Sequence, residues 1–265
     1  MRLKDKTAVL MGGGQSGDGP VGNGRAVALI YAREGASVLV VDRDLAAAER
    51  VAAEIEAAGG SAFAHQANVL EESDIEATMA EADRRWGRID ILHNNVGLSI
   101  EGGDAPITEI TAEAFDHLMA LNLRSFVLAS KHALPVMRRE RGGVIVNISS
   151  IAVNETYPWV GYKASKAAIL ALTEQLAIQN AEYGIRAVTI QPGKIDTVMA
   201  VDARAKAWGK SREEVAAERA ASVPIGRQGT AWDVANAALF LASDEASFIS
   251  GVHLRVDGAA GCRVG

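Results

Sequence analysis

The chain is organised around residues 147–166, NISSIAVNETYPWVGYKASK, in which an apolar run ends at two serines, Ser149 and Ser150. Tyr162 and Lys166 follow four residues apart, a spacing that places both side chains on one face of a helix. An ammonium near a phenol lowers the phenol pKa from its usual value of about 10, so the tyrosine becomes usable as a general base or acid. With a serine hydroxyl to hold the oxygen of an alcohol or carbonyl, the stretch predicts proton transfer at a carbinol oxygen.

On either side of this stretch, short apolar runs alternate with longer segments of helical periodicity. The predicted strands are 7–12, 36–42, 61–69, 90–97, 142–150, 185–193 and 251–258, and the predicted helices are 24–34, 44–57, 72–87, 111–140, 161–184 and 232–243. The segment 111–140 fits one long helix or two, with a kink near Pro135. Because nearly every strand is apolar throughout, we expect an α/β fold, a single-domain doubly wound (Rossmann-like) parallel sheet with helices on both faces.

Residues 194–223 depart from this alternation because they are amphipathic and rich in charge. We expect them to form a substrate flap or a small helical excursion. The chain of 265 residues is long enough for one large α/β domain with a sizeable core. No linker, repeat or low-complexity segment divides the sequence, so we expect a single dinucleotide-binding and catalytic domain over residues 1–265.

The composition argues against several classes of protein. A net charge of −6 without a basic stripe argues against a nucleic-acid partner. No apolar run approaches the roughly 18 residues of a membrane span, and the N-terminal sequence lacks the features of a signal peptide. Cys262 is the single cysteine, so it forms no internal disulfide, and without partner ligands it forms no metal site. We expect a cytoplasmic protein with no membrane, nucleic acid or metal partner.

The glycine-rich sequence GGGQSGDGPVGNG (12–24) separates the first predicted strand from the first predicted helix. Glycines at this position permit a tight turn and let backbone N–H groups approach a pyrophosphate at the helix N-terminus. The loop is long, and its glycine pattern fits two registers, on Gly13, Gly17 and Gly19 or on Gly12, Gly22 and Gly24. The second register is favoured because its last glycine directly precedes the helix, where helix and strand pack closely. The residues between are then looped out.

Asp42, at the end of the second predicted strand, bears on the choice of cofactor. A carboxylate there accepts hydrogen bonds from both ribose hydroxyls of an adenosine and repels a 2′-phosphate, which favours NAD over NADP. Arg43 beside it is a candidate partner for that phosphate. A helix N-cap is an alternative role for Asp42, although Asp44 would fill it equally well. The predicted cofactor is NAD.

With these residues, several motifs in order resemble the short-chain dehydrogenase/reductase superfamily over essentially the whole chain. The motifs are NNVG (94–97), Asn122 in LNLRS, Ser150 with Tyr162 and Lys166, PGKIDT (192–197) and the C-terminal segment 226–258. The resemblance implies an oxidoreductase that transfers hydride between a secondary alcohol and a nicotinamide. The partner would be a small-molecule alcohol or ketone.

The resemblance also implies a role for each site residue. Tyr162 would take or give the hydroxyl proton, while Lys166 would lower the pKa of that tyrosine and hold the nicotinamide ribose. Ser150 would polarise the reacting oxygen, and Asn122 would help to hold a water in a proton relay. The residues that would bind the cofactor are Gly12, Gly22, Asn23, Gly24, Asp42, Asn68, Val69, Asn94, Val96, Gly97, Tyr162, Lys166, Pro192, Gly193, Ile195 and Thr197.

The nucleotide-binding segments depart from the family pattern in two places. The glycine loop is extended and ends in Asn23-Gly24 where the family has Ile-Gly. The pair that brackets the adenine is Asn68-Val69 where the family has Asp-Val. An amide oxygen is still able to accept a hydrogen bond from the adenine amine.

The spacing between serine and tyrosine is a third departure. Counted from Ser150, the gap to Tyr162 is one residue shorter than the commonest spacing, which would instead select Ser149. Strand alternation sends the two serines to opposite sides, so only one of them faces a substrate. The order of the family motifs favours Ser150.

The substrate pocket is expected between 152–159, 194–200 and the flap. The side chains available there are Asn154, Glu155, Tyr157, Trp159, Lys194, Met199 and Trp208. This mixture of aromatic and charged groups favours a polyol, a sugar or a cyclic secondary alcohol over a long acyl chain.

Two other functions are compatible with the sequence. The first is an NADPH-dependent carbonyl reductase, such as a 3-oxoacyl reductase, against which Asp42 argues. The second is a non-catalytic NAD-binding regulator, a class that tends to lose the tyrosine or the lysine, both of which are present here. By family analogy we expect a homotetramer, with interfaces from the helices at 111–134 and 161–180 and from the apolar C-terminal segment.

Overall fold

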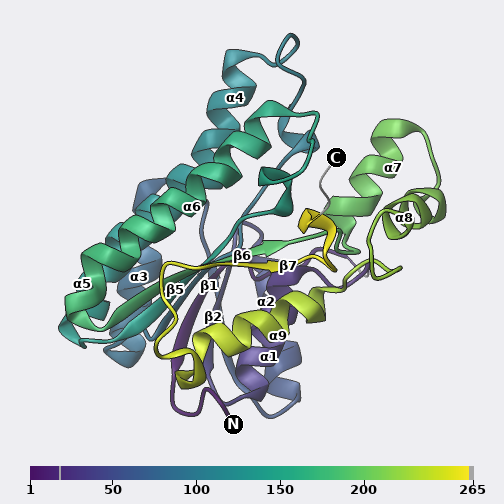
Figure 1. Cartoon of the computed structure of the whole chain (residues 1–265). Coiled ribbons are helices and arrows are strands. Elements are labelled where there is room, and N and C mark those ends of the chain that lie inside the picture. The colour runs from purple at the N-terminus through teal and green to yellow at the C-terminus, as the bar shows by residue number, and fades with distance from the viewer. Residues whose placement is uncertain (18, 263–265) are drawn as a thin grey trace.

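A computed structural model of the chain describes residues 1–17 and 19–262. Within these residues, seven strands form one parallel sheet in the order β3-β2-β1-β4-β5-β6-β7 (Figure 1). The strands are β1 (Thr7–Met11), β2 (Ser37–Asp42), β3 (Ser61–Gln66), β4 (Ile91–Asn94), β5 (Gly143–Ile148), β6 (Ile185–Pro192) and β7 (His253–Val256). The order reverses between β1 and β4, so the loops after these two strands flank the switch point at which α/β sheets bind ligands.

Helices cover both faces of the sheet, as the apolar strands predict (Figure 1). On one face lie α1 (Asn23–Arg33), α2 (Leu45–Ala57) and α9 (Ala231–Ala242), and on the other lie α3 (Glu72–Trp86), α5 (Ser125–Arg139) and α6 (Val160–Asn180). Each set of helices packs on its own hydrophobic core. Val9 and Leu10, neighbours in β1, belong to different cores because successive side chains of a strand point to opposite faces. The predicted doubly wound α/β fold is confirmed.

The segment predicted as one long helix or two contains a π-helical stretch instead of a break. α4 (Ala112–Met119) runs directly into this stretch, Ala120–Arg124, which continues as α5. Pro135 lies inside α5, so the irregularity is not at the proline. Single π turns within α-helices are frequent at functional sites, and Asn122 lies in the middle of this one.

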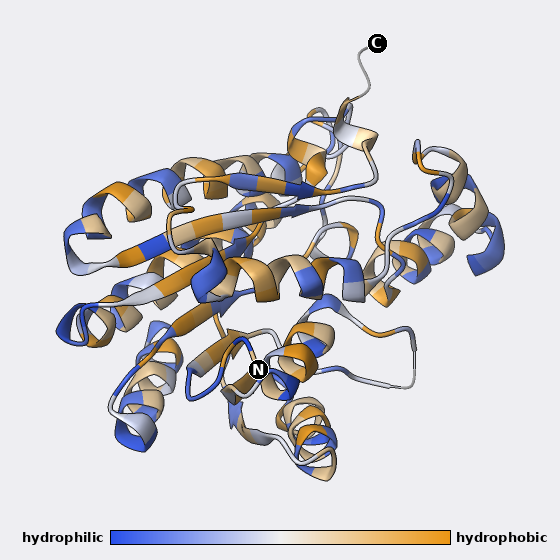
Figure 2. Cartoon of the chain, turned by 60° about the horizontal axis from the view of Figure 1, so that its bottom comes forward, coloured by the Kyte–Doolittle hydropathy of each residue, from blue (hydrophilic) through white to orange (hydrophobic). Residues whose placement is uncertain are grey.

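Residues 194–223 form a helical excursion from the sheet, which we call the flap. It consists of a π-helical stretch (Val198–Asp202), α7 (Ala203–Trp208) and α8 (Arg212–Ala221). Figure 1 shows α7 and α8 next to each other beyond one end of the sheet. The flap has a small core of its own, formed by Val201, Ala205 and Val215. Outside that core its helices carry many hydrophilic residues, coloured blue in Figure 2, whereas the strands are mostly orange.

Short 3₁₀ turns complete the described chain. They are Ile100–Gly102, Ile151–Val153, Ala181–Tyr183, Asp244–Ala246 and Ala260–Cys262. Across residues 1–17 and 19–262, every helix is too short or too polar to cross a lipid bilayer. The predicted site residues lie mainly in the loops that follow the parallel strands and at the starts of the helices after them.

Candidate active site

Gly12 and Gly24 bring the end of β1 into direct contact with the start of α1. Gly12 has a φ of 80°, a conformation that L side chains rarely adopt. A Cβ on Gly24 would lie 2.0 Å from the carbonyl oxygen of Gly12, so only glycine fits there. Gly22 is the N-cap of α1 and provides no capping side chain, which leaves first-turn N–H groups available to an anion. This geometry corresponds to the register on Gly12, Gly22 and Gly24.

Gln15 folds the long part of the glycine loop back on itself. Its Oε1 accepts a hydrogen bond from the backbone N–H of Gly22 at 2.8 Å, and its Nε2 donates to the carbonyl of Gly19 at 3.1 Å. A Cβ on Gly19 would lie 2.7 Å from Cγ2 of Val198. The extended loop therefore reaches the flap.

The Asp42 carboxylate lies at the end of β2, directed at the glycine loop. It accepts hydrogen bonds from the backbone N–H groups of Gly14 and Asp44, each at 3.2 Å. The N-cap of α2 is Asp44, whose side chain accepts from the backbone N–H of Ala46 at 3.1 Å. Since Asp44 caps the helix, Asp42 is not needed for that role. Arg43, between the two, is exposed.

The NNVG turn after β4 divides its side chains between the core and the glycine loop. Asn94 is buried and donates to Oδ1 of Asn147 at 2.9 Å, so its side chain holds β4 to β5. Its side chain therefore points into the sheet, and the expected contact of Asn94 with the cofactor stays a prediction. Asn95 instead donates to the carbonyl of Gly12 at 2.9 Å and ties this turn to the glycine loop. Val96 packs on Gly12 from the same side.

Asn68 and Val69 follow β3 at the same edge of the sheet. Oδ1 of Asn68 accepts a hydrogen bond from the backbone N–H of Leu70 at 3.2 Å, and Val69 packs against the core. The Asn68 side chain is exposed. A carbonyl oxygen has two lone pairs, so one acceptor position on this amide is left for an adenine amine.

Ser149 and Ser150 point to opposite sides of the turn after β5. Ser149 is buried and donates to the main-chain carbonyl of Lys166 at 2.7 Å. Ser150 accepts from the backbone N–H of Ala152 at 3.1 Å, and its hydrogen bond to the phenol of Tyr162 lowers the pKa of that tyrosine. Of the two serines, Ser150 is the one beside Tyr162.

Asp104 holds the first turn of α6, which carries Tyr162. Its two carboxylate oxygens accept hydrogen bonds from the backbone N–H groups of Gly161 at 2.7 Å and Tyr162 at 2.9 Å. The residue at the N-cap position, Trp159, has no side chain suited to capping. A buried carboxylate from a distant part of the chain therefore sets the start of the helix.

The Lys166 ammonium is directed at main-chain carbonyls rather than at the tyrosine hydroxyl. Its Nζ donates to Ile148 at 2.9 Å and to Val96 at 3.5 Å, and it lies 5.7 Å from the centre of the Tyr162 ring. Gly97 leaves the space that the Lys166 ammonium needs, since a Cβ at position 97 would lie 3.2 Å from Nζ. Burial lowers the pKa of Lys166 to about 7 and raises the pKa of Tyr162 to about 12. For the protein by itself, the expected depression of the tyrosine pKa by the lysine is wrong: burial raises this pKa most, and the groups that lower it are Ser150, Arg204 and Arg219.

Asn122 is fully buried in the π-helical stretch, and its side chain is committed to its neighbours. Oδ1 accepts from the backbone N–H of Leu98 at 2.8 Å, while Nδ2 donates to the carbonyl of Leu98 at 2.9 Å and to Ser165 at 3.1 Å. Asn122 therefore joins α6 to the turn after β4. Both polar atoms of the amide are thus engaged, and the expected role of Asn122 in a water relay stays a prediction.

The segment after β6 passes close to the C-terminal end of the described chain. Gly193 follows Pro192, the last residue of β6, and a Cβ on it would lie 2.5 Å from Cα of Asp257. Thr197 is the N-cap of the π-helical stretch, and its hydroxyl accepts from the backbone N–H of Ala200 at 3.3 Å. The hydroxyl keeps its own hydrogen to donate to another acceptor.

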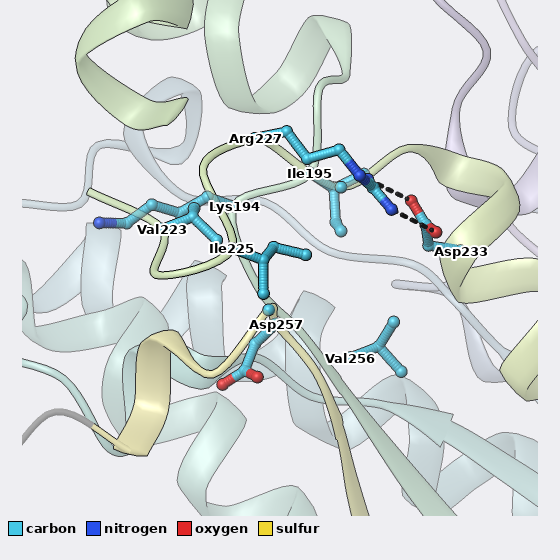
Figure 3. A pocket seen from close by; sticks show the side chains of 10 residues that line it. Lys194, Ile195, Val223, Ile225, Arg227, Asp233, Val256 and Asp257 are labelled. Atoms are coloured by element: carbon cyan, nitrogen blue, oxygen red, sulfur yellow. Dashed lines mark hydrogen bonds and ion pairs between the residues drawn. The ribbon is translucent and has the colours of Figure 1, made fainter. Parts of the chain in front are cut away.

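A small cavity of about 80 Å³ lies beneath this segment (Figure 3). Ile195 forms part of its wall, and Arg227 and Asp233 pair at one side of it. The residues that line the cavity are Lys194, Ile195, Val223, Ile225, Arg227, Gly229, Asp233, Val256, Asp257 and Gly258. Neither Tyr162 nor Ser150 is among them, so the cavity is separate from the candidate catalytic residues.

Two of the expected wall residues form an aromatic cluster with Tyr162, in which Tyr157 contacts Tyr162 and Trp159 meets Tyr157 edge-on. The ring centre of Tyr157 lies 5.7 Å from that of Tyr162 and 5.3 Å from that of Trp159. Four others are exposed or have partners outside this cluster, namely Asn154, Lys194, Met199 and Trp208. Glu155 is half-buried. Of the expected wall, Tyr157 and Trp159 are therefore assembled beside Tyr162, and the third aromatic residue, Trp208, is not.

Comparison with known proteins identifies the family. Residues 21–260 match the family model described as enoyl-(acyl carrier protein) reductase. A crystal structure of a short-chain dehydrogenase/reductase from Burkholderia xenovorans superposes with a TM-score of 0.92, at 37% identity over 100% of this chain and 99% of that one. The chain belongs to the short-chain dehydrogenase/reductase superfamily.

Several relatives of this superfamily member are named as dehydrogenases of hydroxyl compounds. It is 37% identical to 2-(S)-hydroxypropyl-CoM dehydrogenase 3 of Xanthobacter autotrophicus over 97% of each chain. It is 38% identical to a sorbitol dehydrogenase of Cereibacter sphaeroides over 97% of this chain and 98% of the relative. A 7α-hydroxysteroid dehydrogenase complexed with NADH and 7-oxo glycochenodeoxycholic acid superposes with a TM-score of 0.86, at 35% identity over 97% and 94% of the two chains. The protein is an oxidoreductase that acts on a CH–OH group, and its cofactor is a nicotinamide.

In this short-chain dehydrogenase/reductase, the glycine loop and the start of α1 fit a nicotinamide dinucleotide. The contact between Gly12 and Gly24 forms a cradle that any Cβ would fill. Asn23, at the start of α1, has a buried Oδ1 without a hydrogen-bond partner in the described part of the chain, which is an acceptor that a ribose hydroxyl would satisfy. When bound, the nicotinamide supplies the acceptor or donor of hydride.

Sequence reasoning missed two residues that position the site. Asp104 caps α6. The sequence indicates this cap only indirectly, because the start of the helix lacks a capping residue of its own. Asn95 donates a hydrogen bond to the glycine loop. The sequence indicates this role directly, because two adjacent asparagines at the end of a strand point to opposite sides. Both act on residues far away in the sequence.

Proposed function

We propose that this enzyme oxidises a secondary alcohol, such as a polyol, a sugar or a cyclic alcohol, with NAD⁺. Tyr162 accepts the hydroxyl proton in its phenolate form, which the positive charge of a bound nicotinamide would favour. Hydride passes at the same time from the carbinol carbon to that nicotinamide, so the O–H and C–H bonds break as the C=O bond forms. Ser150 donates a hydrogen bond to the reacting oxygen. Lys166 holds the nicotinamide ribose, and the π-helical turn at Asn122 holds the water that returns the proton to solvent.

The observation that carries the preference for NAD⁺ is the Asp42 carboxylate, directed at the glycine loop. A carboxylate accepts hydrogen bonds from both hydroxyls of an adenosine ribose and repels a 2′-phosphate. The preference for polyols and cyclic alcohols is supported by the aromatic cluster at Tyr162 and by relatives named for sorbitol and cyclohexanol.

Calorimetric binding of NAD⁺ and NADP⁺ tests the proposal, on the wild type and on Asp42→Ala. We expect NAD⁺ to bind at least about tenfold more tightly than NADP⁺, and Asp42→Ala to remove that difference. Asp44→Ala is the matched control, because it removes a neighbouring carboxylate that caps α2. It should leave the ratio of the two affinities unchanged.

A preference of the wild type for NADP⁺ would overturn the choice of NAD⁺ and would favour a carbonyl reductase, such as a 3-oxoacyl reductase. Binding of NAD⁺ without turnover of any secondary alcohol or ketone would favour a non-catalytic regulator. The cofactor measurement therefore comes before any substrate screen.

We also propose that the enzyme assembles as a homotetramer. Large apolar side chains are exposed on α5, α6 and β7, at Val127, Ile178 and Leu254. These elements belong to the segments that family analogy predicts at the interfaces, and burial of the three side chains between subunits would remove them from water. Light scattering during gel filtration should give four times the chain mass, and a monomer mass would contradict the proposal.

A further inference from the structure

Arg204, on the flap helix α7, lies against the aromatic cluster at the catalytic tyrosine. Its Nη2 donates to the hydroxyl of Tyr157 at 3.4 Å, and its Nη1 donates to the carbonyl of Ala200 at 2.8 Å. The guanidinium carbon is 5.5 Å from the centre of the Trp159 ring. Since the Tyr157 ring also packs on Tyr162, one aromatic side chain separates Arg204 from the proposed general base.

Arg219, on α8, brings a second guanidinium to the same region. It is half-buried, and it donates from Nε to Gln228 at 2.8 Å and from Nη2 to the carbonyl of Ile195 at 3.2 Å. Burial and the charge of Arg204 lower the pKa of Arg219 to about 10, and the charges of both arginines lower the pKa of Tyr162. The flap therefore holds two positive charges near the tyrosine that repel each other.

Neither guanidinium contacts a carboxylate. Within residues 1–17 and 19–262, no carboxylate lies within 4.0 Å of Arg204 or Arg219. The charges of Asp196 and Glu155 reach Arg219 from farther away, and Asp196 shares Arg212 with Asp202. The hydrogen bonds that the two guanidinium groups make in the protein all go to neutral acceptors, and an anion would give them stronger, charge-assisted bonds.

We propose that Arg204 and Arg219 bind an anionic group on the substrate whose carbinol lies at Tyr162 and Ser150. The inference rests on the proposed alcohol oxidation and narrows its substrate to a hydroxy acid or another secondary alcohol that carries a carboxylate, sulfonate or phosphate. Guanidinium groups form paired hydrogen bonds with two oxygens of such anions and hold them in a fixed orientation. Tyr157 positions Arg204, because its hydroxyl accepts from the guanidinium and also lies 3.2 Å from the Ser99 hydroxyl.

Matched pairs of alcohols test the proposal through the ratio of their kcat/KM values. The pairs are 4-hydroxypentanoate with 2-pentanol, 3-hydroxycyclohexane carboxylate with cyclohexanol, 2-hydroxypropane-1-sulfonate with 2-propanol, and 1-phospho-2-propanol with 2-propanol. We expect the anionic member of at least one pair to be favoured by about tenfold or more, as charge-assisted hydrogen bonds predict. The pair with the largest ratio identifies the anion.

Arginine variants then show whether the flap is responsible. Arg204→Gln and Arg219→Gln should each lower the preference for the anionic member by about tenfold, mainly through KM, and the double variant should abolish it. Arg204→Lys keeps the charge and should recover part of the preference. Lys206→Gln, an equal change of charge on the exposed side of α7, should leave the preference intact. Circular dichroism melting identifies any variant that fails to fold.

The outcomes separate this inference from the function on which it rests. If the wild type oxidises secondary alcohols without preferring any anionic member, the anion site is wrong and the dehydrogenase stands. If both arginine variants lower kcat/KM equally for the two members of every pair, their role is structural and the anion site is wrong. If no alcohol or ketone is turned over with either cofactor, the proposed function fails first.

Discussion

Ser149 donates its hydroxyl hydrogen to the main-chain carbonyl of Lys166, at 2.7 Å, across a separation of 17 residues. This bond ties the turn after β5 to the second turn of α6, the helix that carries both Tyr162 and Lys166. It also commits the buried serine to the backbone. Ser150, its neighbour, is left to face the tyrosine, so one serine supports the helix and the other is available for chemistry.

The two serines should therefore respond differently to removal of the hydroxyl. Ser150→Ala should lower kcat for alcohol oxidation by about 10²-fold with little change in stability, because one group that polarises the reacting oxygen is lost. Ser149→Ala should mainly lower the free energy of unfolding, by about 1 kcal/mol, because the carbonyl of Lys166 loses its partner. Steady-state kinetics with urea denaturation checks both. The reverse pattern would assign the chemistry to Ser149.

Tyr162→Phe should abolish turnover and keep cofactor binding. The phenol is the proposed proton acceptor, so kcat should fall by at least about 10²- to 10⁴-fold, while calorimetric affinity for NAD⁺ should stay within a few-fold. Tyr183→Phe, in the 3₁₀ turn that follows α6, is the matched control with normal activity. A variant at position 162 that retains turnover would remove the tyrosine from the mechanism.

Asp104 is expected to act as a positioning residue through the first turn of α6. Asp104→Ala removes the acceptor of the Gly161 and Tyr162 N–H groups and should cost about 1–2 kcal/mol of stability. Because Tyr162 then moves, kcat should fall, whereas KM for the cofactor should change little. Asp104→Asn retains one acceptor oxygen and should recover part of kcat. Loss of stability without any loss of kcat would give Asp104 a purely structural role.

Gly24→Ala should damage the cofactor cradle. The new Cβ would lie 2.0 Å from the carbonyl oxygen of Gly12, so α1 must shift away from β1. We expect a loss of roughly 1–3 kcal/mol of stability, as for other overpacked sites, together with a fall of more than about tenfold in affinity for NAD⁺. Gly142→Ala is the control, because a Cβ there meets no atom within 4 Å. Normal cofactor affinity in Gly24→Ala would separate the cradle from cofactor binding.

His93 should make the fold sensitive to mild acid. It is fully buried in β4, with Nδ1 3.2 Å from the Tyr31 hydroxyl, and burial lowers its pKa from 6.5 to about 3. Between pH 6.5 and about pH 3, His93 is therefore protonated in the unfolded chain and neutral in the folded chain. The stability from this group is present above pH 6.5 and is lost as the pH falls toward 3, which amounts to about 1 kcal/mol by pH 5.5.

Urea denaturation at pH 7.5 and pH 5.5 measures this loss. His93→Leu removes the titrating group, so its difference in free energy of unfolding between the two pH values should be smaller than that of the wild type by about 1 kcal/mol. His117→Gln, at an exposed position on α4, should behave as the wild type does. An identical pH dependence in His93→Leu and the wild type would contradict the prediction.

The ends of strands show where sequence prediction stops. The apolar runs at 61–69 and 90–97 predict strands, and both strands exist, but they end at Gln66 and Asn94. β3 pairs only with β2, whose last residue, Asp42, is opposite Gln66. Strand length thus depends on the partner strand, which the local pattern does not contain.

The candidate site shows the same limit. Tyr162, Lys166 and Ser150 were recognisable because their spacing and the preceding apolar run are local features. The contacts of Asn94 with Asn147 and of Asn122 with Leu98 were not recognisable from the sequence. A buried amide makes the hydrogen bonds that its packed neighbours offer, and those neighbours are distant in the chain. Arg204 and Arg219 appeared in the sequence only as charges of a surface segment.

The sequence by itself determined the α/β class, the alternation of strands and helices, the glycine turn and the helix face shared by Tyr162 and Lys166. These follow from periodicity and backbone sterics, which act between residues close together in the chain. Only the tertiary structure decided the direction of the Lys166 ammonium, the cap that Asp104 places on α6 from 58 residues away, and the position of the flap arginines near Tyr162. These depend on burial and on contacts between distant segments, and such contacts exist only once the sheet and its helices have packed.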